Sequence, residues 1–524
     1  MALQNFGVTR PAKEINPWLV AIAVMISTFM EVLDTTVVNV SLPHIAGNLS
    51  ATVDEATWAL TSYLVANAII LPMTGWLANY FGRKRLLMVS VTGFTVASFF
   101  CGFAPNLPFL IVFRILQGAA GGGLQPLSQA ILLEVFPPAE RGKAMAFWAL
   151  GIVVAPMLGP VLGGWLTDNY SWRWVFYLNV PVGMLAIILT QIFIFDPSYI
   201  RRTVEKIDYI GMGFLVLGIG ALQIMLDKGQ EEDWFASRFI VVLAVLAITG
   251  LGLFIVHELT ARYPIVDLRV FRYRTYATGV FLMTVLGFVL YGSTVLIPLL
   301  LQTVMGYPAL QAGIAMLPRG LGSFIAMPLV GFLMTKVESR RLLILGILVS
   351  SFSFYRFAHL NLLAGYWDFF WPQIVQGASI GLLFVPLTTI TNDPIPKEGM
   401  GNATSLFNLM RNIGASIGIA SVTTLLARHE QVHTNVLGEN VSRFSPSAQT
   451  MLGGIKGALM ARGSDAATAT QQAYAALFGM VQQQSAMMSF NDVFWILMAV
   501  FLVMLPLVFL MRKPKHQGGD IAVH

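Results

Sequence analysis

The sequence predicts an all-α polytopic membrane protein with about 14 transmembrane helices. Of its 524 residues, 56% are hydrophobic and only 11% are charged, whereas a soluble domain carries about 25% charged residues. The mean hydropathy is +0.71. The apolar runs last about 20 residues, which suits membrane-spanning helices, while the strands of a membrane barrel would alternate over about 10 residues.

The apolar runs follow one another along the chain with short polar connectors between them. An even number of spans after a cytoplasmic start would leave both termini in the cytoplasm. We find no cleavable signal peptide before the first run. The predicted spans are 18–42, 57–78, 86–104, 107–133, 144–166, 175–195, 208–227, 238–258, 276–300, 311–334, 341–361, 369–390, 402–427 and 491–511.

The basic residues support this orientation, because Lys and Arg gather in cytoplasmic connectors. The predicted outer connectors offer little beyond Arg173, Lys228 and Arg238. The net charge of +6 therefore reflects topology, and we expect no nucleic-acid partner. The predicted cytoplasmic connectors and tail carry Arg83, Lys84, Arg85, Arg141, Lys143, Arg201, Arg202, Lys206, Arg262, Arg269, Arg272, Arg274, Lys336, Arg340, Arg341, Lys397, Arg512, Lys513 and Lys515.

The chain also contains an internal repeat at a spacing of roughly 256–259 residues. The segment 75–85 is echoed by 331–341, and Arg114, Gln117 and Gly118 are echoed by Gln373, Gln376 and Gly377. Two such echoes in glycine-rich apolar sequence also arise by chance. Taken as real, they divide the chain into a tail (1–17), a six-helix bundle (18–195), two inserted helices (196–262), a second six-helix bundle (263–511) with an outer segment (428–490), and a second tail (512–524).

Two carboxylates, Glu31 and Asp34, lie inside the first apolar run. A charge at membrane depth is expensive, so an ionisable residue there is a candidate functional site. The two acids share one helical face with Asn39 and other polar residues. A buried acid that binds and releases a proton could couple a pH gradient to transport. The alternative is a hydrogen-bonded acid that stabilises packing.

The fifth predicted span carries small residues at every fourth position: Gly151, Ala155, Gly159 and Gly163. Such a face lets a second helix pack closely. Two prolines in the same span, at 156 and 160, remove backbone donors and bend the helix. Ordinary close packing is the simplest interpretation of this face.

The string at 155–164, which includes Pro156, Pro160 and Gly164, resembles the antiporter motif of the major facilitator superfamily. Segment 33–43 resembles the first-span motif of its 14-span drug:proton antiporters. Segment 75–85 resembles the superfamily's signature loop but departs from it at Asn79 and Tyr80, where that family usually has Asp and Arg. The resemblance implies a gating role for Gly75, Asn79, Gly82, Arg83, Lys84 and Arg85.

Segment 114–118 resembles the superfamily's fourth-span motif, which implies a role in proton transfer for Arg114. A static ion-pair partner is the alternative. The second half has Gln373 at this position and no matching acid pair, so we expect proton coupling by Asp34, Arg114 and Glu31 in the first half. We expect a substrate cavity lined by Glu31, Asn39, Gln117, Gln376, Asn408 and Arg411.

Later stretches are similar to the EmrB-type branch of the superfamily, at 222–235, 264–271, 371–377, 386–391 and 408–418. This resemblance implies a major facilitator fold, a place in the bacterial inner membrane, and export of hydrophobic compounds against proton entry. It also implies an EmrA-like periplasmic adaptor and a TolC-like outer-membrane channel as partners. Segment 428–490, which could form short amphipathic helices, would dock the adaptor or serve as a passive loop.

The sequence offers no sign of an enzyme or of a bound cofactor. It contains no P-loop, no HExxH and no CxxC, and Cys101 is its single cysteine. The histidines, including His429 and His433, are scattered with no evident partner, so we expect no metal site. Two rivals to a multidrug antiporter stay open. One is a dedicated transporter of a fatty acid, siderophore or sugar, and the other is a sensor or scaffold that does not transport.

Overall fold

The computed structural model describes residues 16–196, 207–442 and 444–511, and within these residues it contains helices and no strand. The prediction of an all-α polytopic fold is confirmed. The α-helices are α1 (Pro17–Asn48), α2 (Val53–Phe81), α3 (Arg83–Gly102), α4 (Leu107–Gly121), α5 (Leu124–Val135), α6 (Arg141–Asn169), α7 (Trp174–Tyr177), α8 (Asn179–Phe193), α9 (Tyr209–Lys228), α10 (Arg238–Thr260), α11 (Arg274–Leu299), α12 (Ala309–Ile314), α13 (Leu317–Leu333), α14 (Ser339–Phe357), α15 (Tyr366–Asn392), α16 (Met400–Asn440), α17 (Pro446–Ala461) and α18 (Ala466–Val508).

Among the described residues, 13 helices are long and apolar enough to cross a membrane, some of them joined from two helical pieces. The remaining predicted span, 341–361, corresponds to α14, which packs against α15 and α18 in the bundle. Three arginines, at 340, 341 and 356, lie within its 19 residues and lower its hydropathy. The chain is therefore a multi-pass membrane protein whose helices follow the predicted order.

Local sequence signals start the first two long helices. The Asn16 side chain accepts a hydrogen bond from the Trp18 N–H at 3.0 Å, and Pro17 occupies the first turn of α1, where no backbone donor is needed. Thr52 and Glu55 form a reciprocal capping box at the start of α2. These caps define the residues at which α1 and α2 begin.

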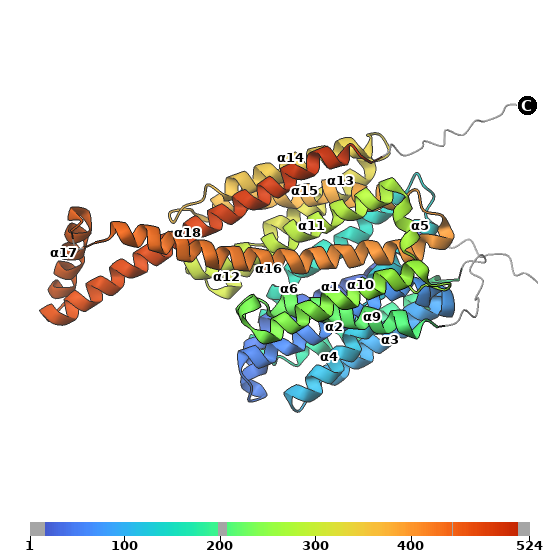
Figure 1. The fold of residues 1–524 in the computed structure, drawn as a ribbon, viewed down its shortest axis with the longest axis horizontal. Coiled ribbons are helices and arrows are strands. Elements are labelled where there is room, and N and C mark those ends of the chain that lie inside the picture. The colour runs from blue at the N-terminus through green and yellow to red at the C-terminus, as the bar shows by residue number, and fades with distance from the viewer. Residues whose placement is uncertain (1–15, 197–206, 443, 512–524) are drawn as a thin grey trace, which may run out of the picture.

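The long helices gather into two groups (Figure 1). In the first half, α1 packs on α6, α2 on α4, and α3 on α4 and α8. In the second half, α11 packs on α16, α13 on α15, and α14 on α15 and α18. The halves touch each other where α6 meets α13 and where α16 meets α2 and α5.

The internal repeat has a structural counterpart. In the first half the Arg114 Nε donates a hydrogen bond to the Ala59 carbonyl at 2.9 Å, and in the second half the Gln373 Nε2 donates to the Ala315 carbonyl at 2.9 Å. Both pairs tie the fourth helix of a half to its second helix, at positions related by the spacing of roughly 256–259 residues. The repeat positions therefore keep one packing role while the residue type changes.

The two inserted helices, α9 and α10, pack on each other, and α9 also contacts both halves. At one end of α9, the Lys228 Nζ donates a hydrogen bond to the Thr57 hydroxyl of α2 at 2.5 Å. On the other side, the Gln223 Nε2 donates to the Ser416 hydroxyl of α16 at 2.9 Å. The inserted pair thus lies across the junction between the halves.

An arm projects from one end of the bundle (Figure 1). It is built from the far ends of α16 and α18, which are 41 and 43 residues long, with α17 packed against α18 at its tip. We expected short amphipathic helices over 428–490, but most of this segment extends the two neighbouring spans. The stretch at 466–488 is rich in Ala, Gln and Met, which favour helix, and contains no proline.

Some sequence predictions concern residues outside the described part of the chain. These are the cytoplasmic placement of most of the tails at 1–17 and 512–524 and the basic connector with Arg201, Arg202 and Lys206.

Candidate functional site

Asp34 of α1 lies at the centre of a buried polar network inside the first half. The Arg114 Nη1 of α4 lies 2.5 Å from the Asp34 Oδ2. The Gln117 Nε2 donates to the Asp34 Oδ1 at 3.0 Å, and the Asn179 Nδ2 of α8 donates to the same oxygen at 2.6 Å. Asp34 is 1% exposed and Arg114 is fully buried. Three helices therefore hold one desolvated ion pair.

The remaining contacts of Arg114 fix its orientation. Its Nε donates to the Ala59 carbonyl, and its Nη1 donates to the Gln117 Oε1 at 2.8 Å. The guanidinium also lies over the Tyr63 ring, 4.2 Å from the ring centroid, in a cation–π contact. Removing one partner of such a buried pair costs about 3–5 kcal/mol, because a charge is left without compensation.

Glu31, one turn before Asp34, belongs to a different network. Its Oε1 accepts a hydrogen bond from the Asn67 Nδ2 of α2 at 2.9 Å, and the carboxylate is buried. Gln125 of α5 accepts a hydrogen bond from Arg411 of α16, at the junction of the halves. The two acids that share a helical face in the sequence thus have different neighbours.

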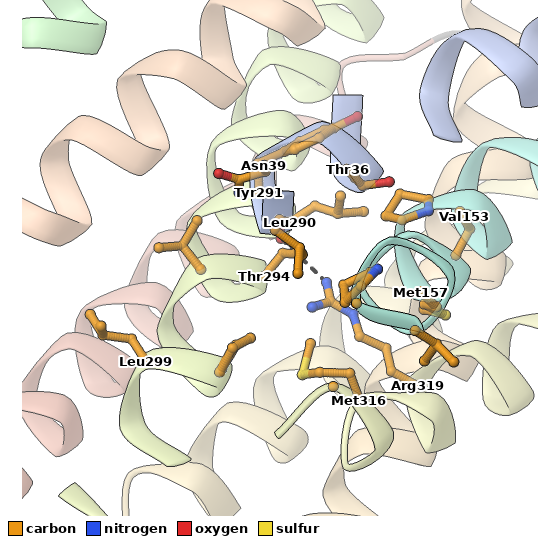
Figure 2. Close-up of a pocket in the computed structure, with 18 of the residues that line it drawn as sticks. Thr36, Asn39, Val153, Met157, Leu290, Tyr291, Thr294, Leu299, Met316 and Arg319 are labelled. Atoms are coloured by element: carbon orange, nitrogen blue, oxygen red, sulfur yellow. Dashed lines mark hydrogen bonds between the residues drawn. The ribbon is translucent and has the colours of Figure 1, made fainter. Parts of the chain in front are cut away.

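A cavity of about 720 Å³ lies between the two halves (Figure 2). Its mouth is at the end of α1 and α6 where His44 and Asp168 are exposed, with side-chain exposures of 51% and 70%. The lining residues are Thr36, Asn39, Val40, Pro43, His44, Ile152, Val153, Pro156, Met157, Pro160, Val161, Gly164, Thr167, Asp168, Leu286, Gly287, Leu290, Tyr291, Thr294, Val295, Pro298, Leu299, Gln302, Thr303, Gly313, Met316, Arg319, Ile380, Phe384 and Arg411.

Below the mouth, the charged residues that line the cavity are two arginines, Arg319 of α13 and Arg411 of α16. The Arg319 Nη2 donates to the Leu290 carbonyl at 3.3 Å, a bond drawn in Figure 2, and to the Ser293 hydroxyl at 3.2 Å. The Arg319 Nη1 and the Arg411 Nη1 have no hydrogen-bond partner among the described residues. The cavity thus combines apolar walls with unsatisfied cationic donors.

The predicted cavity residues divide into two sets. Asn39 and Arg411 line the cavity. Four others, Glu31, Gln117, Gln376 and Asn408, are buried in helix packing and do not line it. Our predicted set also left out Arg319, although an arginine inside an apolar span is a signal that the sequence does give.

Several uncharged polar residues of the cavity were also missing from the predicted set: Thr36, Tyr291 and Thr294. Their hydroxyl groups carry no distinctive sequence signal, because such residues are common in membrane helices. Asn179, which binds Asp34, was also missed, because a single uncharged polar residue in a membrane helix carries no distinctive sequence signal.

The small-residue face of α6 packs against α1. A side chain at Gly159 would collide with Thr36, and a Cβ at Gly163 would lie 2.9 Å from the Val37 carbonyl oxygen. At the other end of this face, a Cβ at Gly151 would lie 3.1 Å from the Met25 Sδ. Ala155 is buried, whereas nothing lies within 4 Å of a Cβ at Gly164.

Close contacts between the halves seal the end of the molecule opposite the mouth. A Cβ at Gly75 of α2 would lie 2.6 Å from the Asn402 Cα of α16. Across the other junction, Gly142 of α6 lies against Met334, where a Cβ would come within 3.1 Å of the Sδ. The first contact is with backbone atoms and the second with the Met334 side chain, so the two halves are closely packed at both junctions.

The loop at this sealed end shows which basic residues are fixed. Arg83 forms a buried ion pair with Glu134, and the Lys84 Nζ donates to the Gln191 carbonyl at 2.6 Å. By contrast, Asn79 and Arg85 are exposed. Gly82, with φ +89°, makes the turn between α2 and α3.

A second ion pair crosses the sealed end from one half to the other. The Arg141 Nη1 of α6 lies 3.8 Å from the Asp393 Oδ1, just after α15. Burial raises the pKa of the Asp393 carboxyl, and Arg141 offsets part of that rise. At 3.8 Å, and with the Asp393 side chain 40% exposed, this pair contributes little, about 0–1 kcal/mol.

Comparison with known proteins supports the fold and suggests relatives. Residues 24–419 match the family model of the Major Facilitator Superfamily. The chain is 40% identical over 504 residues to the multidrug export protein EmrB of Escherichia coli (strain K12), covering 96% of each chain. It is 38% identical over 503 residues to the fatty acid resistance protein FarB of Neisseria gonorrhoeae, covering 95% of this chain and 97% of FarB.

Among solved structures, the fold matches that of the proton:xylose symporter XylE bound to 6-bromo-6-deoxy-D-glucose. The TM-score is 0.60 over 95% of this chain and 96% of XylE, at 14% sequence identity. At this identity, the likeness concerns the fold alone.

Proposed function

The chain belongs to the major facilitator superfamily and to its EmrB-type branch, and we propose that it is a proton-driven antiporter that exports hydrophobic compounds across the bacterial inner membrane. It is a transporter rather than an enzyme. One observation carries the coupling step of this proposal: Asp34, which pairs with the buried Arg114, lies on α1, and another side of this helix lines the cavity.

The conformation corresponds to one state of an alternating-access cycle. With the predicted cytoplasmic N-terminus, the mouth of the cavity faces the outside and the sealed end faces the cytoplasm. In major facilitator proteins the two halves rock about a site near the bilayer midplane. The contacts of Gly75 and Gly142 would have to separate for the cavity to open inward.

Coupling would pass through α1. Asp34 and Thr36 are two residues apart, so they lie on nearly opposite sides of the helix. Asp34 binds Arg114 inside the first half, while Thr36 lines the cavity and packs against Gly159 of α6. A proton on Asp34 would neutralise the carboxylate and weaken its ion pair with Arg114. Substrate in the cavity would contact the opposite side of the same helix.

For the proton to drive transport, it must bind the two states of the protein with different affinity. In the structure, Asp34 accepts hydrogen bonds from three side chains, those of Arg114, Gln117 and Asn179. A cycle that moves these donors would give Asp34 a different environment in the second state. That difference is the source of the driving force in our proposal.

The cargo would be hydrophobic compounds of varied shape. The walls of the cavity are mainly aliphatic and aromatic, and Met157 and Met316 among them are flexible and polarizable. EmrB of Escherichia coli is described as a multidrug export protein. A cavity of about 720 Å³ is within the size range of drug-binding pockets, about 300–1,000 Å³.

We further propose that the arm docks a periplasmic adaptor, with an outer-membrane channel beyond it. The arm lies on the side of the molecule where the cavity opens (Figure 1). It carries exposed apolar side chains, among them Met451 of α17 and Tyr474 and Phe478 of α18. Clusters of exposed apolar residues mark protein–protein contact sites. Efflux into the medium should then require the arm, whereas proton coupling in liposomes should not.

The proposal is tested by substrate-triggered collapse of a preformed pH gradient in proteoliposomes. We expect collapse with the wild type and none with Asp34→Asn. Asp233→Asn is the matched control, because this exposed acid lies outside both the Asp34 network and the cavity. Equal collapse by wild type and Asp34→Asn would contradict the coupling role, and no collapse by wild type with several unrelated drugs would contradict multidrug antiport.

A second candidate is a dedicated exporter of one class of amphiphilic carboxylates, such as fatty acids. The two arginines of the cavity favour it, because each has a free donor beside an apolar wall. FarB of Neisseria gonorrhoeae is described as a fatty acid resistance protein. Competition separates the candidates: neutral and cationic drugs would compete with a long-chain carboxylate in a multidrug antiporter and would leave a dedicated exporter unaffected.

A further inference from the structure

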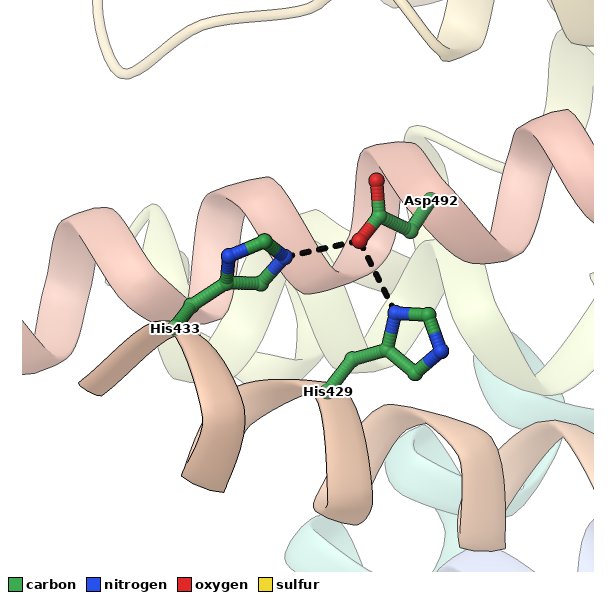
Figure 3. A group of neighbouring side chains, drawn as sticks. All are labelled: His429, His433 and Asp492. Atoms are coloured by element: carbon green, nitrogen blue, oxygen red, sulfur yellow. Dashed lines mark hydrogen bonds and ion pairs between the residues drawn. The ribbon is translucent and has the colours of Figure 1, made fainter. Parts of the chain in front are cut away.

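Two histidines and one aspartate meet where the arm leaves the bundle (Figure 3). His429 and His433 are four residues apart on α16, so both point to the same side of that helix. Asp492 reaches them from α18, the neighbouring helix. The Asp492 Oδ2 lies 2.8 Å from the His429 Nδ1 and 2.7 Å from the His433 Nε2.

From this geometry we propose that His429, His433 and Asp492 form a binding site for a divalent transition-metal ion of the Zn²⁺ type. One nitrogen from each histidine and one carboxylate oxygen converge, and the three atoms lie within 4.8 Å of one another. Two imidazoles and one carboxylate are ligands that Zn²⁺ accepts in tetrahedral sites. Mg²⁺ and Ca²⁺ prefer oxygen ligands, so this donor set selects against them.

The spacing needs only a small adjustment to accept the ion. Zinc–nitrogen and zinc–oxygen bonds of about 2.0–2.2 Å place tetrahedral ligand atoms about 3.3 Å apart. The two histidine nitrogens now lie nearer than that to the carboxylate oxygen, so these atoms must part by about half an ångström. Rotations about the side-chain torsions of these three partly exposed residues would supply this movement.

The site is also accessible to ions from the outer side. The side chains of His429, His433 and Asp492 are 34%, 19% and 38% exposed. By the predicted spans, 402–427 and 491–511, all three lie at or just beyond the outer membrane surface. Three protein ligands leave a fourth position for water or for a group from another molecule.

The location gives the ion a mechanical role. The site links α16 to α18 at the outer ends of the predicted spans 402–427 and 491–511, where the helices that form the projecting arm of Figure 1 begin. A bound ion would cross-link the two helices and hold the arm at one angle. Without the ion, the two histidines donate weaker hydrogen bonds to the same carboxylate oxygen.

The test is metal binding by the full-length protein in detergent or nanodiscs, purified with a tag that contains no histidine. The probes are Co²⁺, whose visible absorption reports tetrahedral coordination, and Zn²⁺ in competition with a chromophoric chelator. We expect one Co²⁺ per chain, displaced by Zn²⁺ and not by excess Mg²⁺. Absence of tetrahedral Co²⁺ bands in the folded wild type would overturn the proposal.

Variants assign the binding to these residues. The double variant His429→Gln/His433→Gln and the single variant Asp492→Asn should each bind Zn²⁺ at least tenfold more weakly. His44→Gln is the matched control, since His44 lies near a carboxylate, Asp168, in a pair that has no second histidine. Equal Zn²⁺ affinity of the wild type and the double variant would show that the cluster is a hydrogen-bonded group that binds no metal. The readout is independent of transport, so it stands or falls separately from the proposed antiport.

Discussion

The buried charged residues of the two halves differ in their partners and in their contact with the cavity. In the first half, Arg114 is sealed against Asp34, and the pair has no contact with the cavity. In the second half, Arg319 has no acidic partner among the described residues and lines the cavity. Arg319 stands at the repeat position of Tyr63, which covers Arg114 with its ring.

This difference teaches how one repeated scaffold can serve two tasks. The helix contacts are kept, as the paired bonds of Arg114 with Ala59 and of Gln373 with Ala315 demonstrate. In our proposal, the charge of the first half holds an exchangeable proton site away from the cargo, and the charge of the second half faces the cargo.

The largest expected effect is on the sealed pair. Asp34→Asn should lower the free energy of unfolding by about 3–5 kcal/mol, because it leaves the buried Arg114 without a counter-charge. Arg319→Gln should change it by less than about 1 kcal/mol, because this variant leaves no buried counter-charge unpaired. Unfolding by denaturant in one detergent, followed by tryptophan fluorescence, measures both. Equal losses of unfolding free energy in the two variants would contradict this difference between the halves.

The double variant Asp34→Asn/Arg114→Gln sharpens this prediction. Removing both charges leaves no uncompensated ion, so we expect stability within about 1–2 kcal/mol of the wild type. Proton coupling should stay lost. A double variant as unstable as Asp34→Asn alone would mean that the ion pair does not explain the loss.

The sequence predicted these charges better than their surroundings. Asp34, Arg114 and Arg411 can be found because a charge inside an apolar span is rare and expensive. Asn179 and Tyr63 could not, because nothing in one sequence tells which polar or aromatic side chains of different helices meet. The helical class and the order of spans follow from hydropathy, which reports burial in lipid directly.

The arm and its histidines were beyond the reach of sequence patterns. His429 and His433 are separated from Asp492 by about 60 residues, and only the long continuation of α16 and α18 brings them together. Helix propensity decides that length, and hydropathy does not report it. The metal site that we propose therefore depends on the structure alone.

The next largest effect is expected at the contact between α6 and α1, because α1 carries Asp34 and also lines the cavity. Gly159→Val should destabilise the protein by about 1–3 kcal/mol and slow transport, because its side chain would collide with Thr36 and push α6 from α1. Gly252→Val on α10 is the control, because nothing lies within 4 Å of a Cβ at this position and it does not line the cavity. Thermal unfolding and liposome transport compare the two. If both variants behave alike, close packing of α6 on α1 is not what the motif provides.

A smaller effect is expected on cargo binding. Arg319→Gln should weaken the binding of an amphiphilic carboxylate by about 10- to 100-fold, because a charge-assisted hydrogen bond contributes about 1.5–3 kcal/mol. A neutral drug of similar size should bind nearly as well as before. Isothermal titration with both ligands, and with Arg356→Gln as an off-cavity control, checks this. Equal weakening for both ligands would contradict a role of the Arg319 charge in recognising the carboxylate.

The smallest effect belongs to the pair of Arg141 and Asp393 at the sealed end. Burial raises the pKa of Asp393, so the folded protein holds its proton to a higher pH than the unfolded chain does. Asp393 therefore contributes stability at low pH that is lost as pH rises through its folded pKa. Its side chain is 40% exposed, and water screens the effect.

Asp393→Asn should accordingly change stability by less than about 1 kcal/mol and flatten the pH dependence slightly in the acidic range. Thermal unfolding from about pH 4 to pH 7 measures the difference. Stability that rises with pH in the wild type and not in the variant would contradict the assigned direction.

The most direct test of the account is the dependence of substrate affinity on pH, measured by titration calorimetry on purified protein. Because linkage is reciprocal, a proton that opposes substrate must weaken substrate binding as strongly as substrate weakens proton binding. We predict that the wild-type Kd rises by up to about tenfold for each unit that the pH falls. For Asp34→Asn the Kd should be independent of pH. The same slope in both proteins would contradict the claim that protonation of Asp34 opposes the binding of cargo.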